Sequence, residues 1–506
     1  MEHGDIGGGE DRTRGQGTDM PKTDSDGGKP TRGGFSRRLL IGGALAAGAG
    51  GAAGALVLSR TEVGVALGRS RARSLVGADR LPAAVDVVVI GGGFVGASAA
   101  LTLAERGVSV ALCEKGVVAG EASGRSMGFV YSQWADPAKM GLLERSKTLW
   151  AAMNARTGLE TGYRRTGVVA PLAGPEQAAY AEAWLASVAG APGVDGRVIS
   201  KSEIARLFPA MRDPPDQALL SQTDASVEPV LAAPAIAEAA QRKGAIVLQN
   251  CAARGLETSA GRVSGVVTER GVIACKAVIL AGGAWSPMFA RSVGAGFRQV
   301  DVFLSMLSLS PVAGPEVSLS SEAFGFRRQI DGGYSVGVVE MAVPLDGDLI
   351  AAALSAPSTV QALMPQARLG FSASRAWDEM MSPRRWKLDR PSPFEARRIL
   401  EPIYWARPPA EALAKLIERF PVFAAAQIRD RWAGAISTTI DNMPVISEAP
   451  RVPGLFIGSG FANGLTFGPA AGEALADLAT GRAPSFDLGG YRMSRFTDGG
   501  KLAYHS

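Results

Sequence analysis

Three glycines and one acidic residue have the types and spacing that most directly indicate chemistry. Gly91, Gly93 and Gly96 follow the apolar run 87–90, and Glu114 lies 23 positions after Gly91. Residues without a Cβ let backbone N–H groups approach a pyrophosphate, and an acid at this distance can accept hydrogen bonds from ribose hydroxyls. A carboxylate there disfavours a 2′-phosphate. The spacing therefore predicts a dinucleotide site for a cofactor other than NADP.

The elements that must position these residues form one strand, loop, helix and strand unit. Residues 87–90 are an apolar, β-branched run, which is typical of a parallel strand buried on both faces. A helix should follow the glycine-rich turn and end at Gly107, and residues 108–113 should form the second strand. This order places the phosphate at a helix N-terminus, where free N–H groups and the helix dipole favour negative charge.

Composition narrows the class of protein. The chain has 506 residues, enough for two domains, and its net charge of +5 with no basic stripe gives no indication of nucleic acid binding. Its two histidines, His3 and His505, lie in polar terminal segments, so we expect neither a metal site nor an imidazole base. Three cysteines without metal-ligand spacing, Cys113, Cys251 and Cys275, are expected to be core thiols rather than disulfides.

The N-terminal segment differs from the rest of the chain. Residues 1–35 are polar and glycine-rich, which is typical of disorder, and Arg37 and Arg38 then precede an apolar, glycine- and alanine-rich stretch at 39–58. The segment 36–60 resembles a twin-arginine export signal. We therefore expect a periplasmic or extracytoplasmic protein, with two alternatives: the segment stays as a membrane anchor, or the arginine pair is a chance match and the protein is cytoplasmic.

Three later blocks carry a family resemblance. The first is Ala-Ser-Gly-Arg-x-x-Gly at 122–128, the second is Gly-Gly-Ala-Trp-Ser at 282–286, and the third is Thr-x-Asp-x-x-Pro-x-Ile at 439–446 followed by a glycine-rich run to Pro469. In this order they resemble the D-amino-acid oxidase superfamily of FAD-dependent oxidoreductases, which includes glycine oxidase, sarcosine oxidase and D-amino-acid dehydrogenase. The glycine-rich run should lead into a helix over residues 470–480, and Pro469, directly before it, should mark its start.

The resemblance implies an α/β fold with two interleaved domains. A Rossmann-like FAD-binding domain with a parallel sheet is expected from residues 84–160, 220–300 and 411–485. A mixed-sheet α+β substrate domain is expected from 161–219 and 301–410. Residues 341–410 match no small glycine-oxidase-like member, and we expect them to influence substrate choice or to form a lid or partner surface.

The same resemblance implies FAD as the cofactor. Non-covalent binding is expected, because the C-terminal block has no cysteine and the glycine-rich loop has no nearby histidine. In this family a helix N-terminus in the C-terminal block points at the flavin and stabilises negative charge on it. The expected FAD-binding residues are Gly91, Gly93, Phe94, Val95, Gly96, Glu114, Lys115, Ala122, Ser123, Gly124, Arg125, Ser126, Gly128, Gly282, Gly283, Trp285, Gly460, Asn463, Gly464, Leu465 and Thr466.

Substrate residues are expected on a hairpin at 324–337. Family members bind the substrate carboxylate with an arginine on such a hairpin, which makes Arg327 or Arg328 the candidate. Adjacent strand residues point to opposite faces, so at most one of the two should face the flavin. Tyr334, Tyr131 and Gln133 are further candidates for the pocket.

The expected activity is oxidation of the C–N bond of an amino acid or secondary amine by hydride transfer to flavin N5, with oxygen or a quinone-type acceptor receiving the electrons. Two alternatives stay open. One is oxidation of a 2-hydroxy acid, and the other is a non-catalytic flavin-binding subunit of an oxidoreductase complex.

Overall fold

A computed structural model describes residues 71–338, 341–344, 349–350, 353–354, 357, 367–370, 385–499 and 502–505. The expected tail at 1–35, the twin-arginine-like segment at 36–60 and most of 341–384 lie outside the described residues. None of the helices in these ranges is long and apolar enough to cross a membrane.

A six-stranded sheet carries the glycine-rich unit. In spatial order its strands are β20 (Val445–Glu448), β21 (Leu455–Ser459), β12 (Ala277–Leu280), β1 (Val87–Ile90), β2 (Val110–Cys113) and β8 (Ile246–Leu248). Val87 lies opposite Ala277 on one side and Val110 on the other, both in parallel register. The edge strand β20 runs antiparallel to β21, and the other pairings are parallel. All four residues of β1 are buried, as expected for a central parallel strand.

Alternate residues of β1 pack into different layers. Val87 and Val89 belong to a core with the helices α3 (Phe94–Glu105), α5 (Met140–Ala151), α9 (Pro229–Arg242) and α16 (Gly464–Ala479). Val88 and Ile90 belong to a second core with α10 (Ser286–Ser292) and an antiparallel sheet of β9 (Ala253–Ser259), β10 (Arg262–Thr268) and β11 (Gly271–Ala274). Both faces of the parallel sheet are therefore covered.

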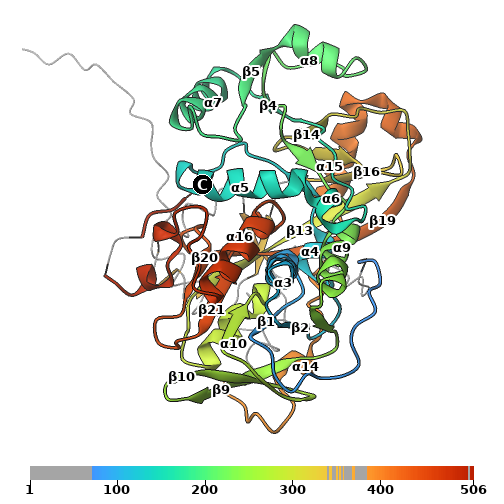
Figure 1. Ribbon diagram of the computed structural model, residues 1–506. Coiled ribbons are helices and arrows are strands. Elements are labelled where there is room, and N and C mark those ends of the chain that lie inside the picture. The colour runs from blue at the N-terminus through green and yellow to red at the C-terminus, as the bar shows by residue number, and fades with distance from the viewer. Residues whose placement is uncertain are drawn as a thin grey trace, which may run out of the picture. The chain divides into compact units, whose positions relative to one another are not determined.

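Helices α3 and α16 lie side by side over the sheet (Figure 1). A Cβ on Gly472 of α16 would lie 2.5 Å from the carbonyl oxygen of Val95, and one on Gly468 would lie 2.6 Å from the Cβ of Phe94. These distances are shorter than van der Waals contact, so the two glycines permit the close approach of the helices.

The second large sheet of the structure is mixed and has ten strands. Its order is β18 (Ala367–Gly370), β17 (Met341–Pro344), β13 (Gln299–Leu309), β16 (Tyr334–Gly337), β15 (Gly325–Arg328), β14 (Ser318–Ser320), β4 (Val168–Leu172), β6 (Gln217–Ser221) and β5 (Arg197–Ser200), with β19 (Ile428–Thr439) also paired to β13. The pairing of β13 with β19 is antiparallel and runs from Gln299 opposite Thr439 to Leu309 opposite Ile428.

Further helices and one short strand pair lie outside the strands of these sheets. The described helices among them are α4 (Ala122–Arg125), α6 (Met153–Thr157), α7 (Pro175–Ser187), α8 (Lys201–Leu207), α14 (Pro393–Ala396) and α15 (Arg407–Arg419). Strands β3 (Phe129–Val130) and β7 (Ala225–Ser226) pair with each other. Five short 3-10 helices lie in the part of the chain that the structure describes: Pro137–Lys139, Gly283–Trp285, Pro421–Ala425, Gly489–Tyr491 and Met493–Phe496.

The α/β fold class, with a parallel sheet interleaved with a mixed sheet, is confirmed. The strand within residues 411–439 belongs to a different sheet from the one we expected. Residues 411–439 were expected in the FAD-binding domain, but β19 is part of the ten-stranded sheet, and the chain rejoins the parallel sheet at β20. The long antiparallel pairing with β13 holds β19 in the mixed sheet, because it satisfies the backbone of nearly the whole strand.

Candidate functional site

The glycine-rich loop between β1 and α3 has the geometry that its sequence indicates. Gly91 has a φ of +108°, and a Cβ there would lie 2.3 Å from the carbonyl oxygen of Ala281. A Cβ on Gly96 would lie 2.0 Å from the carbonyl oxygen of Gly91, so helix and loop pack without a side chain between them. The Phe94 N–H, at the first turn of α3, donates to the Ser123 hydroxyl at 3.0 Å. The loop 120–128 therefore lies directly against the helix N-terminus.

Glu114 lies just after β2, where the spacing places it. Its carboxylate accepts hydrogen bonds from the backbone N–H groups of Gly92 at 2.7 Å and Gly116 at 2.8 Å. Burial raises the pKa of this carboxyl, while Lys115 and the two N–H donors oppose that shift. The backbone thus fixes an acidic group beside the glycine-rich loop.

A cavity of about 1100 Å³ opens beside these groups. Eighteen of the expected FAD-binding residues line it: Gly91, Gly93, Phe94, Val95, Glu114, Lys115, Ala122, Ser123, Arg125, Ser126, Gly282, Gly283, Trp285, Gly460, Asn463, Gly464, Leu465 and Thr466. The structure therefore brings together side chains and backbone from segments that are almost 400 positions apart in the sequence.

Three expected residues lie outside this lining. Gly96 packs against the loop as described above. Gly124 would place a Cβ 2.2 Å from the carbonyl oxygen of Ala119, and Gly128, with a φ of +101°, would place one 2.3 Å from Nε of Arg327. These glycines permit close packing around the cavity rather than forming its wall.

Arg125 lines the cavity, but its charge is already paired. Its guanidinium donates to both carboxylate oxygens of Glu401, at 2.8 and 2.6 Å, and to the carbonyl oxygens of Gly120 and Ala433, at 3.2 and 3.3 Å. Arg125 therefore holds the loop in place, and sequence reasoning did not identify Glu401 as its partner.

The N-terminus of α16 also lines the cavity, although the helix begins earlier than predicted. We predicted a start at Pro469, whereas α16 begins at Gly464 and contains that proline. A proline lacks the N–H that would bond the carbonyl four residues before it. That carbonyl, on Leu465, instead accepts a hydrogen bond from the Trp150 indole N–H at 3.0 Å. The helix tolerates Pro469 because α5 supplies the missing donor.

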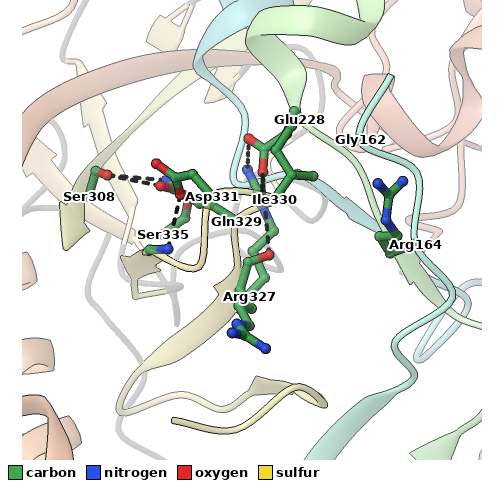
Figure 2. A network of polar contacts seen from close by, with 12 residues as sticks. Gly162, Arg164, Glu228, Ser308, Arg327, Gln329, Ile330, Asp331 and Ser335 are labelled. Carbon is green, nitrogen blue, oxygen red and sulfur yellow. Dashed lines mark hydrogen bonds and ion pairs between the residues drawn. The ribbon is translucent and has the colours of Figure 1, made fainter. Parts of the chain in front are cut away.

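The hairpin candidates lie elsewhere than expected: Arg327, Arg328 and Tyr334 are absent from the lining of the large cavity. Arg327 is buried and donates to both oxygens of Glu228, at 2.8 and 3.1 Å, as Figure 2 shows. Arg328 is partly exposed and pairs with Glu316 at 2.8 Å.

Tyr334 is fully buried and packs edge-on against Phe423, with 4.8 Å between ring centroids, while its hydroxyl donates to the carbonyl oxygen of Pro315. Burial raises its pKa to about 12. We expected Arg327, Arg328 and Tyr334 to face the substrate, but they do not line the large cavity. Ion pairs hold the two arginines elsewhere, and Tyr334 packs in an aromatic core.

Tyr131 and Gln133 do line the cavity. The Tyr131 hydroxyl donates to Oδ1 of Asn463 at 3.5 Å, and burial raises its pKa. Gln133 donates from Nε2 to the carbonyl oxygens of Val168 and Leu219, at 2.9 and 3.2 Å, which fixes its side chain between β4 and β6.

Sequence reasoning missed several lining residues. They are Glu121 and Lys139, the apolar Leu304, Met306, Phe324 and Ile436, and Phe394, Leu400 and Tyr504. Lys139 is buried, which lowers its pKa to about 8, and its ammonium donates to the carbonyl oxygen of His505 at 3.3 Å. Phe324 lies in the expected hairpin at 324–337 but was not singled out there. For Leu304 and Met306, alternation along β13 could have indicated that some of its side chains face a pocket.

The site fits FAD on three observations. The cavity volume of about 1100 Å³ slightly exceeds the ~300–1,000 Å³ found for ligand pockets, as a long dinucleotide requires. A Cβ on Gly93 would project to 2.8 Å from the Ser123 hydroxyl, in the space where the loop faces the cavity. Two helix N-termini, of α3 and α16, line the cavity and favour negative charge on a bound group.

Comparison with known proteins agrees with this geometry. A family model described as "FAD dependent oxidoreductase" matches residues 86–478. The structure of an L-amino acid deaminase from Proteus myxofaciens superposes with a TM-score of 0.81 at 33% identity, covering 86% of this chain and 98% of that one. The deaminase from Proteus vulgaris gives 0.79 at 30% identity, covering 84% and 100%.

Curated relatives are more distant in sequence. Human mitochondrial sarcosine dehydrogenase is 26% identical over 82% of this chain, and glycine oxidase from Pseudomonas putida is 25% identical over 80% of it. The match covers 97% of the glycine oxidase but only 42% of the sarcosine dehydrogenase, so the chain spans less than half the length of that relative.

Proposed function

Because this chain belongs to the DAO family of FAD-dependent oxidoreductases, we propose that it oxidises the C–N bond of an amino acid or a secondary amine. FAD is its cofactor. An α-amino acid is the first candidate substrate, since the two L-amino acid deaminases match over nearly their whole length. The observation that carries the proposal is this match, which covers 98% of the Proteus myxofaciens deaminase. A cavity that continues from the FAD-binding loops to the ten-stranded sheet supports it.

The lining on the side of the ten-stranded sheet suits an amine in its neutral form. Leu304 and Met306 on β13, with Phe324 and Ile436, surround this part of the cavity with apolar groups. An apolar site disfavours a charged ammonium and so lowers the pKa of a bound amine. When bound, FAD supplies an acceptor for the hydride, which carries two electrons away from the substrate carbon.

Polar groups at the same cavity can orient the substrate. The Tyr131 hydroxyl lies against Asn463, at the start of α16, and so connects the cavity wall to a helix N-terminus. Lys139 contributes a buried cation to the lining, which suits a carboxylate. With these groups, binding and orientation need no histidine at the site.

An anaerobic substrate panel tests the proposal. The purified holoprotein is mixed with α-amino acids, N-methylated amines and 2-hydroxy acids, and the flavin absorbance at about 450 nm is followed. Bleaching by an amino acid or amine, with release of the carbonyl product, is the expected result. Bleaching by hydroxy acids alone would support the 2-hydroxy-acid alternative. A flavin that dithionite reduces but no panel member does would support the subunit alternative.

We also propose export and a membrane-side electron acceptor. The support is Arg37 and Arg38 before the apolar stretch 39–58, a pattern typical of twin-arginine signals, which carry folded cofactor proteins. A quinone-type acceptor suits that compartment, and the stretch 39–58 would allow membrane association. Replacing both arginines by lysine should leave the protein in the cytoplasm of the cell, as fractionation would show. Rapid reoxidation of the reduced flavin by air would instead identify oxygen as the acceptor.

A further inference from the structure

Residues 385–401, which we call the strap, lie within the segment 341–410, which matches no small glycine-oxidase-like family member. The strap contains α14, which lies next to β9 (Figure 1). Glu395 of α14 accepts hydrogen bonds from Arg254 of β9 at 2.6 and 3.2 Å, and the Trp386 indole N–H donates to the Arg254 carbonyl at 2.7 Å. The strap is therefore attached to the half of the molecule that contains the glycine-rich unit.

The strap and Lys115 hold each other by reciprocal contacts. The Lys115 ammonium donates to the backbone carbonyls of Arg397 and Arg398, at 3.1 and 2.7 Å. In return, the Arg398 guanidinium donates to the Lys115 carbonyl at 2.7 Å and to both carboxylate oxygens of Glu269, at 2.8 and 2.6 Å. The residue directly after Glu114 is thus bound to the strap through both its side chain and its backbone.

Glu121 joins the strap to two loops of the cavity. Its carboxylate accepts hydrogen bonds from the Leu400 N–H at 2.8 Å, the Lys115 ammonium at 2.7 Å and the Trp285 indole at 3.0 Å. The Lys115 ammonium also lies 4.2 Å from the centroid of the Trp285 ring. Lys115 lies in the loop after β2, Glu121 in the loop before α4 and Trp285 in the segment after β12. The Glu121 carboxylate therefore connects three segments that line the cavity.

The end of the strap is fastened by a second ion pair. Glu401 receives two hydrogen bonds from Arg125, whose side chain is only 5% exposed. Between the fastenings at Arg398 and Glu401, Leu400 lines the large cavity, as does Phe394 of α14. Phe394 packs edge-on against Trp285, with 6.0 Å between ring centroids.

We propose that the strap is a retaining element of the FAD site, in which Phe394 and Leu400 contact the cofactor and Glu121, Arg398 and Glu401 hold them in position. The strap forms the cavity wall near Glu114 and Lys115, so FAD can leave at this end only when the strap detaches. The proposal rests on FAD binding and not on the identity of the substrate.

The test is the rate at which FAD leaves the holoprotein, followed by the rise in flavin fluorescence after dilution. Arg398→Gln and Glu401→Gln each remove one fastening, and Leu400→Ala removes an apolar contact. Each should raise the release rate about tenfold, which corresponds to the loss of one modest interaction. Arg197→Gln is the matched control, because it breaks an exposed pair with Glu203 far from the strap in sequence.

The melting temperature of each apoprotein shows whether a variant loses FAD because the strap is weakened or because the whole protein is destabilised. The proposal expects faster FAD release in the strap variants while their apoproteins melt within a few degrees of the wild type. Release at the wild-type rate in all three strap variants would overturn it, as would acceleration of the same size in Arg197→Gln. None of these measurements requires turnover, so failure of the proposed amine oxidation would leave the result readable.

Discussion

Arg327 and Glu228 form a buried, two-fold hydrogen-bonded ion pair, with N–O distances of 2.8 and 3.1 Å. The same carboxylate accepts the Ile330 N–H at 3.0 Å (Figure 2). The Arg327 Nε also donates to the carbonyl oxygen of Met127. Because β15 belongs to the ten-stranded sheet and Glu228 precedes α9, the pair joins the two halves of the molecule.

Arg327→Met should therefore reduce stability. Removing one partner leaves a charge buried without compensation, which costs about 3–5 kcal/mol. Urea unfolding of the holoprotein measures the loss. Arg328→Met is the control, because its pair with Glu316 is exposed and should contribute less than about 1 kcal/mol. Equal losses in the two variants would contradict this role for Arg327.

Glu114→Ala should weaken FAD binding. It removes a carboxylate that the backbone N–H groups of Gly92 and Gly116 hold in the cavity. Loss of a charge-assisted hydrogen bond, about 1.5–3 kcal/mol, corresponds to a Kd raised about 10- to 100-fold. Titration of the apoprotein with FAD, followed by flavin fluorescence, gives the Kd. Glu105→Ala, at the far end of α3, should bind FAD like the wild type.

Trp150→Phe should destabilise the protein by leaving the Leu465 carbonyl without its indole donor. An unsatisfied buried carbonyl costs about 1–3 kcal/mol. Pro469→Ala restores the helical N–H at that carbonyl, so Trp150→Phe should cost less in the Pro469→Ala background. Unfolding free energies of the four proteins of this double-mutant cycle measure the coupling. Strictly additive losses would show that the indole and Pro469 are independent.

The stability of the protein should rise with pH in the range where Lys139 titrates. Burial lowers the pKa of this lysine from 10.5 to about 8. Between these values the unfolded chain binds more protons than the native protein, so the unfolding free energy increases with pH. Relative to Lys139→Met, the wild type should gain up to about 3 kcal/mol across this window.

Lys276→Met provides a control of opposite sign for that experiment. The hydrogen bond with Asp86 raises the pKa of Lys276, so its contribution is lost as pH rises through the folded-state pKa. Chemical unfolding at several pH values measures both differences. A flat difference between the wild type and Lys139→Met would mean that the ammonium is not desolvated.

The features of the site that could be predicted from the sequence depend on residues close together in the chain. Strand β1 occupies the predicted residues 87–90, and Gly91 and Glu114 lie where their spacing places them, because one strand, turn and helix unit determines their geometry. Alternation along β15 was also informative: Arg327 is buried and Arg328 is partly exposed. The pattern could not show that Glu228, rather than a cavity, lies on the buried side.

The remaining features depend on contacts between distant segments. Leu400 reaches the cavity only because Glu121, Glu269 and Arg125 hold the strap, and no periodicity encodes those pairings. Likewise, Pro469 is a reasonable helix start in sequence, and only the position of Trp150 shows why the helix extends past it. Tertiary partners, rather than propensity, decided each of these cases.

The strand pairing of the parallel sheet has a consequence for biosynthesis. Val87 pairs with Ala277, whose strand in turn pairs with β21 at residues 455–459. A nascent chain that has emerged only through β8 lacks half of the sheet and the helix N-terminus of α16. The complete cavity, which includes the N-terminus of α16, can therefore form only after translation has passed that helix, at Ala479.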